Sequence, residues 1–318
     1  MSAELVFVGG TGRSGTHVVS HLLGEHSRFA AVPIECRFHS NPRGLADVVM
    51  GRATPEEFVT KLRRFWWHRV RLGGRATVRL RGLLGRGGGE AKVRGLHKIV
   101  ESDRFEQAVA RFEAESSSDV ILASRNLFFD LLGPIASEQG KPALVEMSCF
   151  TIAAAPGLAR IFPEARFVHS VRDGRDSGSS KVSKRQKEHH PTDVASGIEW
   201  WERRLRLAEE GFRGLPDASV LHVVSLDELV WGDRGPSYAG LLDFLGVDDE
   251  EPMHRFFDER MNADAAHRER WREGRSPGEQ QRLVEAYAAA LDRISSEGFH
   301  CAPLLRRSFE RAGVAAAR

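Results

Sequence analysis

The chain has 318 residues, of which 41% are hydrophobic and 28% charged, and its formal net charge is +2. This balance excludes a globally basic nucleic-acid-binding protein, and 3 cysteines without metal-binding spacing exclude a disulfide-rich scaffold and a zinc ribbon. We find no apolar run of about 18 residues that would span a membrane and no signal peptide, so we expect a cytoplasmic protein.

Strands and helices alternate along the chain. The apolar run Leu5–Gly9 ends at glycines, which is typical of a buried parallel strand. Further strands are expected at Ala30–Ile34, Ala143–Met147, Ala165–Val171 and Ser219–Val224. Helices are expected at His17–Leu23, Thr54–Val70, Asp103–Glu115, Leu127–Gln139, Leu158–Phe162, after Asp176, and at Asp193–Phe212, Leu241–Leu245 and Gly278–Ser295. The alternation predicts an α/β fold with a parallel sheet flanked by helices, in a single domain over residues 1–318.

A glycine-rich loop follows the first strand. Gly10 and Gly15 have the GxxxxG spacing of a phosphate-binding loop, in which backbone amides and the start of a helix attract an anion. A P-loop would have lysine at Thr16 and serine or threonine at His17, whereas here the positive charge lies inside the loop, at Arg13. A sulfuryl group carries fewer peripheral charges than a phosphoryl group, so these groups would suffice to bind it without a metal ion.

The loop sequence Gly12-Arg13-Ser14-Gly15-Thr16 resembles the 5′-phosphosulfate loop of sulfotransferases that use 3′-phosphoadenosine 5′-phosphosulfate (PAPS). It is most similar to the branch with arginine in the loop, which holds tyrosylprotein sulfotransferases and many bacterial enzymes. The resemblance implies a P-loop-like nucleotide-binding sulfotransferase fold. It also implies that these five residues bind the donor, and His17 at the start of the following helix would assist them.

A second segment, from Phe167 to Ser180, resembles the part of the same family that binds the 3′-phosphate. Arg172 at the end of a strand offers a permanently charged, forked donor set, and Ser180 follows about two helical turns later. The resemblance implies that both residues bind the 3′-phosphate of the donor. A structural ion pair between Arg172 and Asp173 is the alternative. Near the C-terminus, Arg270 resembles a basic residue that reaches back to the cofactor's phosphate, with a solvated charged helix as the alternative.

Transfer to a hydroxyl needs a base, which contributes roughly 10²–10⁴ in rate. In the tyrosylprotein branch this is a glutamate just after the second strand, and Glu35 stands at the matching distance from the loop. Its apolar neighbours Val32, Pro33 and Ile34 predict a pKa raised toward neutrality. An ion pair between Glu35 and Arg37 is the alternative interpretation. Histidine alternatives for the base are His17, His39, His97 and His169.

One position departs from the family pattern. Related enzymes often have a lysine after the middle strand, near the bridging oxygen, and here the segment reads Glu146-Met147-Ser148-Cys149. Met147 carries no charge and donates no hydrogen bond. Stabilisation of the leaving group is therefore expected from Arg13, from Ser148 or from elsewhere.

The predicted function is a PAPS-dependent sulfotransferase that moves a sulfuryl group to a hydroxyl of a small molecule, lipid or glycan by metal-free in-line displacement. The nucleotide product would be adenosine 3′,5′-bisphosphate, and we expect a bacterial enzyme without a nucleic-acid partner. A small-molecule kinase of the P-loop type and a non-catalytic protein that binds nucleotides or polyanions are the alternatives.

Residues 41–120 match the family least and are expected to form a variable helical and loop region that covers the substrate. Within them, Lys61–Val100 carries twelve Lys or Arg and one acidic residue, Glu90. The stretch Gly73–Gly89 has no sustained periodicity, which is typical of a mobile loop. The basic block is either a solvated cover over the site or a guide for an anionic acceptor, in which case the residues involved are Arg63, Arg64 and Arg69 beside Trp66 and Trp67.

Overall fold

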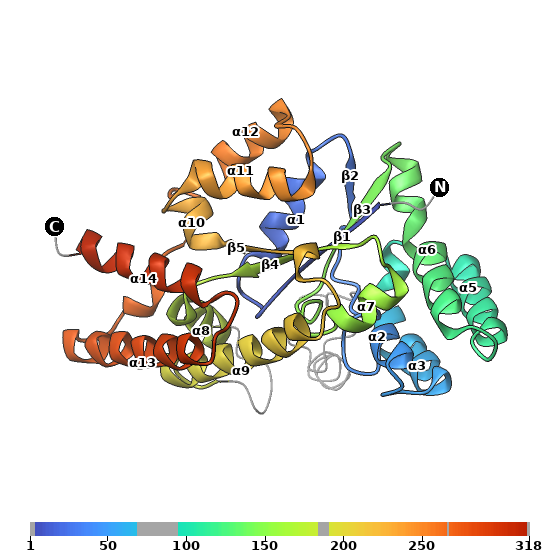
Figure 1. Ribbon diagram of the computed structural model, residues 1–318, viewed down its shortest axis with the longest axis horizontal. Helices are drawn as coiled ribbons and strands as arrows, with labels where there is room; N and C mark the ends of the chain where they lie inside the picture. Colours follow the sequence, from blue (N-terminus) through green and yellow to red (C-terminus); the bar gives the residue numbers. More distant parts are fainter. Residues whose placement is uncertain (1–3, 69–94, 184–190, 266, 317–318) are drawn as a thin grey trace, which may run out of the picture.

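A five-stranded parallel sheet forms the centre of the molecule (Figure 1). The structure, a computed structural model, describes residues 4–68, 95–183, 191–265 and 267–316. The strands are β1 (Glu4–Gly10), β2 (Phe29–Ala31), β3 (Ala143–Met147), β4 (Arg166–Val171) and β5 (Leu221–Ser225). They lie in the order β2-β3-β1-β4-β5, and every neighbouring pair is parallel. The α/β class predicted from the sequence is confirmed.

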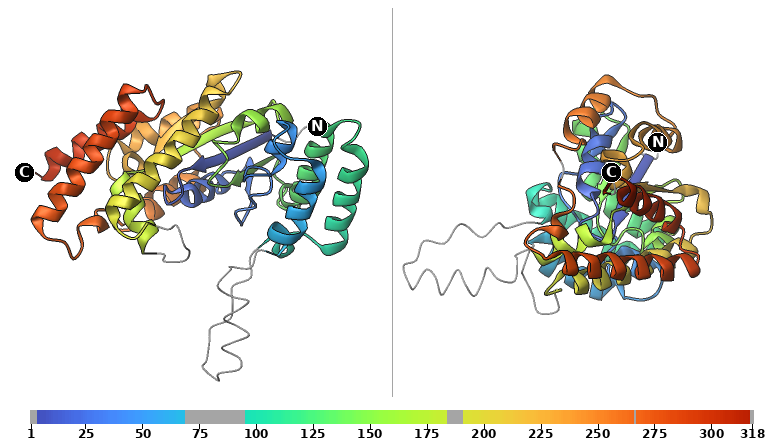
Figure 2. Two further views of the ribbon diagram at one scale, coloured as in Figure 1. Left: turned by 90° about the horizontal axis from the view of Figure 1, so that it is seen from below. Right: turned by 90° about the vertical axis from the view of Figure 1, so that its left-hand side faces the viewer.

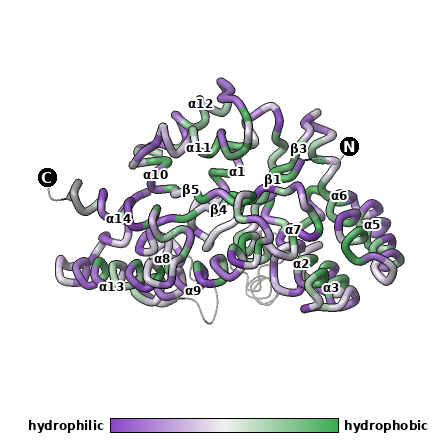
Figure 3. Tube along the Cα trace, in the orientation of Figure 1, coloured by the Kyte–Doolittle hydropathy of each residue, from purple (hydrophilic) through white to green (hydrophobic). Residues whose placement is uncertain are grey.

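Alternate residues of β1 supply the two main cores. Leu5 and Phe7 face one side of the sheet and pack with α2, α3, α5, α6 and α7, whereas Val6 and Val8 face α1 and α10–α12 on the other side. A third core joins Val171 at the end of β4 to α9, α13 and α14. Figure 3 shows the hydrophobic residues gathered in the strands and in the helix segments that pack on them. This double-sided burial explains why the strand sequences are continuously apolar.

The helices cover both faces and both ends of the sheet. They are α1 (Thr16–Gly24), α2 (Leu45–Val49), α3 (Pro55–Lys61), α5 (Ser102–Glu115), α6 (Val120–Glu138), α7 (Ala155–Ile161), α8 (Gly174–Val182), α9 (Val194–Arg213), α10 (Leu226–Val230), α11 (Arg234–Leu245), α12 (Glu251–Arg260), α13 (Pro277–Ser296) and α14 (Ala302–Ala316). Figure 2 shows α13 and α14 at one end of the molecule and α3, α5 and α6 at the other.

Several boundaries differ from the sequence prediction, each for a local reason. The second strand lies one to three residues earlier than expected and is short. The helix expected over Thr54–Val70 begins at Pro55, after a capping box on Thr54, but from Leu62 to Trp67 it widens into a π-helix. The helix expected at Leu127 begins at Val120, because the Asp119 side chain accepts hydrogen bonds from the amides of Ile121 and Leu122 at 3.0 and 2.9 Å.

Helix α6 corrects the expectation that nothing in the chain is long and apolar enough to span a membrane. By length and composition alone it passes such a test, with 19 residues and a mean hydropathy of 1.2. It packs against α5 along its length and contacts α2, α7, β2 and β3. Its buried side is part of the core that surrounds Phe7.

The carboxyl ends of the strands meet at one edge of the sheet, where open α/β folds bind their ligands. The loop after β1, the segment after β2 and the segments after β3 and β4 all reach this edge. The residues that the sequence marks as candidates therefore follow strands that are neighbours in the sheet.

Candidate functional site

The loop between β1 and α1 has the backbone of an anion-binding turn. Gly12, Arg13 and Gly15 have φ angles of 84°, 65° and 92°, and α1 begins at Thr16. A Cβ at Gly10 would collide with the Ser14 hydroxyl and with a backbone carbonyl of β4, so glycine is required there. The Ser14 hydroxyl is buried without a hydrogen-bond partner among the described residues. Such an orphaned donor, beside a helix start, fits a bound anion.

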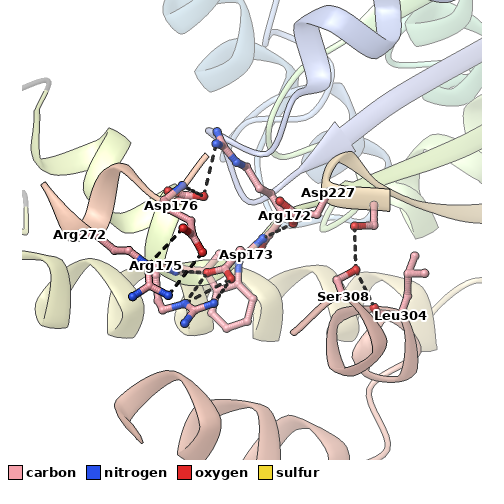
Figure 4. A network of polar contacts seen from close by, with 11 residues as sticks. Arg172, Asp173, Arg175, Asp176, Asp227, Arg272, Leu304 and Ser308 are labelled. Atoms are coloured by element: carbon pink, nitrogen blue, oxygen red, sulfur yellow. Dashed lines mark hydrogen bonds and ion pairs between the residues drawn. The ribbon is translucent and has the colours of Figure 1, made fainter. Parts of the chain in front are cut away.

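Arg172 begins the second anion-binding segment, directly after β4. Its Nε is buried without a hydrogen-bond partner among the residues described, its Nη2 donates to the His267 carbonyl, and it lies 3.7 Å from Asp176. Figure 4 shows this arginine at the edge of a polar network. Asp173, the alternative partner, pairs with Arg175 instead at 2.6 Å and caps α8. Arg172 therefore keeps hydrogen-bonding capacity for a ligand.

The two anion-binding segments meet through one hydrogen bond. Arg13 Nε donates to Ser180 Oγ at 2.8 Å, although the residues are far apart in sequence. Burial, and then the nearby charge of Arg172, lower the pKa of Arg13. Two arginines thus approach a common region, which favours an anionic ligand.

Acidic side chains belong to the same polar network as Arg172 (Figure 4). Asp227 accepts a hydrogen bond from the amide of Asp173 at 2.7 Å, and Asp176 accepts one from Glu269 at 3.0 Å. Burial, reinforced by the charge of Asp173, raises the pKa of Asp176 to about 6 and that of Asp227 to about 7. Their partial protonation near neutral pH limits how far they neutralise Arg172.

Glu35 lies after β2 and is held from two sides. Its Oε2 pairs with Arg37, and its Oε1 accepts from the amide of Cys149 at 3.2 Å. Burial raises its pKa, but the charge and hydrogen bond of Arg37, together with Cys149, outweigh burial and lower the pKa to about 2. The expected rise toward neutrality is wrong, and the alternative interpretation, an ion pair between Glu35 and Arg37, is the one that the structure shows.

Buried hydrogen bonds fix the segment that carries Glu35 to the end of β3. The amide of Arg37 donates to Ser148 Oγ at 3.1 Å, and Ser148 Oγ donates to Glu146 Oε1 at 2.8 Å. Glu146 Oε2 lies 2.8 Å from His39 Nε2, and both side chains are fully buried. The segment that departs from the family pattern therefore acts here as an anchor for Glu35.

The histidines considered as bases occupy different places. His39 is buried against Glu146, and His169 is fully buried with its Nδ1 2.9 Å from His300 Nε2. Burial, and then His300, lower the pKa of His169 well below its ordinary value. His97 Nδ1 lies 2.8 Å from the carbonyl of Trp67. Only His17 of this set is exposed, in the first turn of α1 beside the loop.

Two cations at the site, Lys181 and Arg204, were not expected from the sequence, and Arg37 was expected there only as a partner of Glu35. Together with Arg13, these three cations lie around Cys149 and act electrostatically on one another. Burial, and then the charge of Glu35, raise the pKa of Cys149 to about 12. That pKa leaves Cys149 a neutral thiol, as packing requires. Lys181 directly follows Ser180, the one signal in the sequence that could have drawn attention to it.

Arg270 and Trp271 follow a segment that contacts the second anion-binding segment. Arg270 is half exposed and 3.9 Å from Glu273, while the backbone of the preceding residues contacts Arg172 and Asp176. Trp271 is completely buried and packs against the guanidinium of Arg175 at 4.4 Å, so it is a core residue.

The basic block is only partly described, and the predicted loop Gly73–Gly89 and Arg69 lie outside the described residues. Trp66 is buried, Trp67 stacks on Phe105 at 4.0 Å, and Arg63 pairs with Glu106. The two tryptophans are therefore packing residues.

No group of three or more metal-binding side chains is found within the described ranges. A groove of about 1440 Å³ does lie at the other end of the sheet, lined by residues that precede β2 and β3 and by α5 and α6. None of the candidate residues borders it.

Comparison with known proteins gives one family. The profile of the sulfotransferase family matches residues 5–251. No curated protein sequence matches the chain. Among solved structures, the chain is similar to the sulfotransferase domain of the curacin biosynthetic pathway, with 16% identity, a TM-score of 0.49, and 90% of this chain and 98% of that one covered.

Two further solved structures show a comparable likeness. One is the sulfotransferase domain of a Synechococcus olefin synthase, with 16% identity, a TM-score of 0.45, and 90% of this chain and 94% of that one covered. The other is a Mycobacterium tuberculosis sulfotransferase, with 13% identity, a TM-score of 0.45, and 91% and 77% covered.

Proposed function

The chain belongs to the sulfotransferase family, and we propose that it transfers the sulfuryl group of PAPS to a hydroxyl of a small molecule, lipid or glycan. The hydrogen bond between Arg13 and Ser180 carries the proposal. It joins the two segments that would hold the 5′-phosphosulfate and the 3′-phosphate of one nucleotide. A ligand with anions at both ends would engage both residues at once.

The residues present fit this donor. The loop from Gly12 to Thr16, with the buried hydroxyl of Ser14 and the charge of Arg13, would hold the phosphosulfate, and the exposed His17 would assist. Arg172, with its unpartnered Nε, and Ser180 would hold the 3′-phosphate, and Arg270 would reach a phosphate from the C-terminal side. PAPS supplies an activated sulfuryl group with few charges to neutralise, so the arginines and amides would suffice without a metal ion.

Glu35 is proposed as the group that receives the proton of the acceptor hydroxyl. The anchor through Ser148 and Glu146 supports this role, because it holds the segment that carries the carboxylate in one position. While Arg37 is paired with it, Glu35 has a pKa of about 2 and is a weak base. The proposal therefore requires that the ion pair with Arg37 weakens when the acceptor binds. Arg13 would stabilise the leaving group in place of the lysine that Met147 replaces.

The remaining expectations stay predictions. They are a single domain over residues 1–318, a substrate-covering role for residues 41–120, a cytoplasmic location and a bacterial origin.

Turnover tests the proposed reaction and its rivals. The protein is incubated with a panel of hydroxyl compounds and either PAPS or ATP with Mg²⁺, and the products are identified by mass spectrometry. The proposal predicts sulfate esters and adenosine 3′,5′-bisphosphate with PAPS alone. Phosphate esters formed only from ATP would instead indicate a kinase.

A further inference from the structure

Two glycines bring α8 and α9 into close contact beside the phosphate loop. A Cβ at Gly178 would lie 2.8 Å from the backbone of Gly197, so neither position has room for a side chain. Three residues further along each helix, Lys181 Nζ lies 4.9 Å from the centre of the Trp200 ring. The glycine contact therefore sets where this lysine points.

Arg204, one turn beyond Trp200 on α9, is near enough to Lys181 to act on it electrostatically. Its guanidinium lies 3.5 Å from the centre of the Phe150 ring, and its Nε donates to the carbonyl of Thr11 at 3.3 Å. The side chain is half-buried and held at both the loop after β1 and the segment after β3. Such a constrained arginine is a preorganised donor for an oxyanion.

These cations border the reacting side of the site. A Cβ at Gly12 would lie 3.5 Å from Cys149 Sγ and 3.7 Å from the ring of Trp200. The amide of Cys149 donates to Glu35. The loop, Trp200 and the proposed base thus lie around Cys149.

Lys181 and Arg204 have no ion-pair partner among the described residues. The charge of Glu35 acts on Arg204, but Glu35 is already paired with Arg37. Burial lowers the pKa of both Lys181 and Arg204, and the charge of Arg204 lowers that of Lys181 further. Like charges held close together at partly buried positions favour binding of an anion.

We propose that Lys181, Arg204 and Arg37 form a subsite for an oxyanion of the acceptor, a carboxylate, sulfate or phosphate group near the hydroxyl to be modified. The inference rests on the proposed function, in which the anions of the donor are held by the loop and by Arg172. The acceptor is then an acidic molecule. Its anion would also draw Arg37 away from Glu35, which frees the carboxylate to accept a proton.

Small oxyanions serve as probes of the subsite. The protein is saturated with adenosine 3′,5′-bisphosphate and titrated with acetate, sulfate or inorganic phosphate, and binding is followed by calorimetry and by tryptophan fluorescence. At least one anion binds the unmodified protein, and which of the three binds best identifies the acidic group. Lys181→Gln and Arg204→Gln each weaken that binding about tenfold, as expected for loss of a charged hydrogen bond.

Two matched variants and one comparison make the result specific. Lys98→Gln and Arg203→Gln remove exposed cations elsewhere, the second from the residue next to Arg204, and should leave anion affinity unchanged. Lys181→Gln should also leave affinity for the bisphosphate within about twofold, whereas Arg13→Gln weakens it. No anion binding, unchanged binding in both test variants, or a loss of bisphosphate affinity in Lys181→Gln as large as in Arg13→Gln would overturn the subsite.

The two proposals fail separately. If the bisphosphate does not bind, the proposed function fails, and the same anion titrations on the nucleotide-free protein still report on Lys181 and Arg204. If the bisphosphate binds and the anions do not, only the acidic acceptor is lost.

Discussion

Arg13 Nε lies 2.8 Å from Ser180 Oγ and donates a hydrogen bond to it, so the loop after β1 is joined to the helix after β4. The parallel pairing of β1 with β4 makes this possible, because it places the carboxyl ends of the two strands side by side. A nucleotide that carries anions at both its 5′ and 3′ positions would engage these residues together.

Ser180→Ala and Arg172→Gln should each weaken binding of adenosine 3′,5′-bisphosphate about tenfold or more, because each removes a hydrogen bond to a charged group. Binding of adenosine 5′-phosphate, which lacks the 3′-phosphate, should change little. Calorimetry with both nucleotides measures the difference. Ser183→Ala, one turn further along, is the control, and equal losses for the two nucleotides would contradict the assigned role.

Glu35→Gln should lower turnover at least about 100-fold and leave donor affinity nearly unchanged, because the amide keeps the shape but accepts no proton. Initial rates at saturating PAPS, with bisphosphate binding measured in parallel, separate the two effects. Glu113→Gln, at an exposed position on α5, is the matched control. Near-normal turnover would remove Glu35 from the role and direct attention to His17.

Arg37→Gln should raise the pKa of Glu35 above its value of about 2, because the charge and the hydrogen bond of Arg37 no longer oppose the effect of burial. The acidic limb of the kcat/KM profile should move to higher pH accordingly. Arg52→Gln, which breaks an exposed pair with Asp47, is the control. A profile that does not move would show that Glu35 is not the titrating base.

Stability should fall as pH rises through the range in which Asp227 ionises. Its pKa is raised from 3.8 to about 7 in the folded chain, so the folded state binds the proton more tightly than the unfolded state. The stabilising effect of protonation is greatest at low pH and is lost between these values. The unmodified chain loses this contribution between pH 4 and pH 8, and Asp227→Asn does not. The free energy of unfolding of Asp227→Asn should therefore rise by about 2–4 kcal/mol relative to that of the unmodified chain over this range. Denaturant unfolding at both pH values tests this, with the exposed Asp243→Asn as control. An equal change in the free energy of unfolding between the two pH values in all three proteins would contradict it.

Gly178→Ala should destabilise the fold by about 1–3 kcal/mol, because the new Cβ must push α8 away from the backbone of Gly197. Gly240→Ala in α11 is the matched change, since nothing lies closer than 3.9 Å to its Cβ, and it should be neutral or stabilising by up to about 1 kcal/mol. Thermal unfolding of the two variants gives the comparison. Equal stability would mean that the close approach of the helices contributes little.

Local patterns in the sequence predicted the strands well and the loop after β1 in detail. Ala143–Met147 is a strand over the predicted residues, because an apolar run with flanking breakers leaves few alternatives. Helix α6 was predicted too short, since it begins at Val120, after the cap Asp119 and seven residues before the expected start, and Pro134 does not interrupt it.

Local sequence offered the ion pair between Glu35 and Arg37 as an alternative, and the structure shows it, with Arg37 at φ 69°. The other groups near Glu35 could not be predicted in this way. Cys149 follows a different strand, and Lys181 and Arg204 lie on two helices that approach closely at Gly178 and Gly197. These arrangements are tertiary, and they change the predicted chemistry of the site.

Calorimetry with adenosine 3′,5′-bisphosphate and, separately, with ATP tests the central claim most directly. The account predicts that the bisphosphate binds at a single site and more tightly than ATP, and that Arg13→Gln and Arg172→Gln both weaken it. Failure of the bisphosphate to bind while ATP binds would contradict the assignment of the two anion-binding segments to one PAPS site.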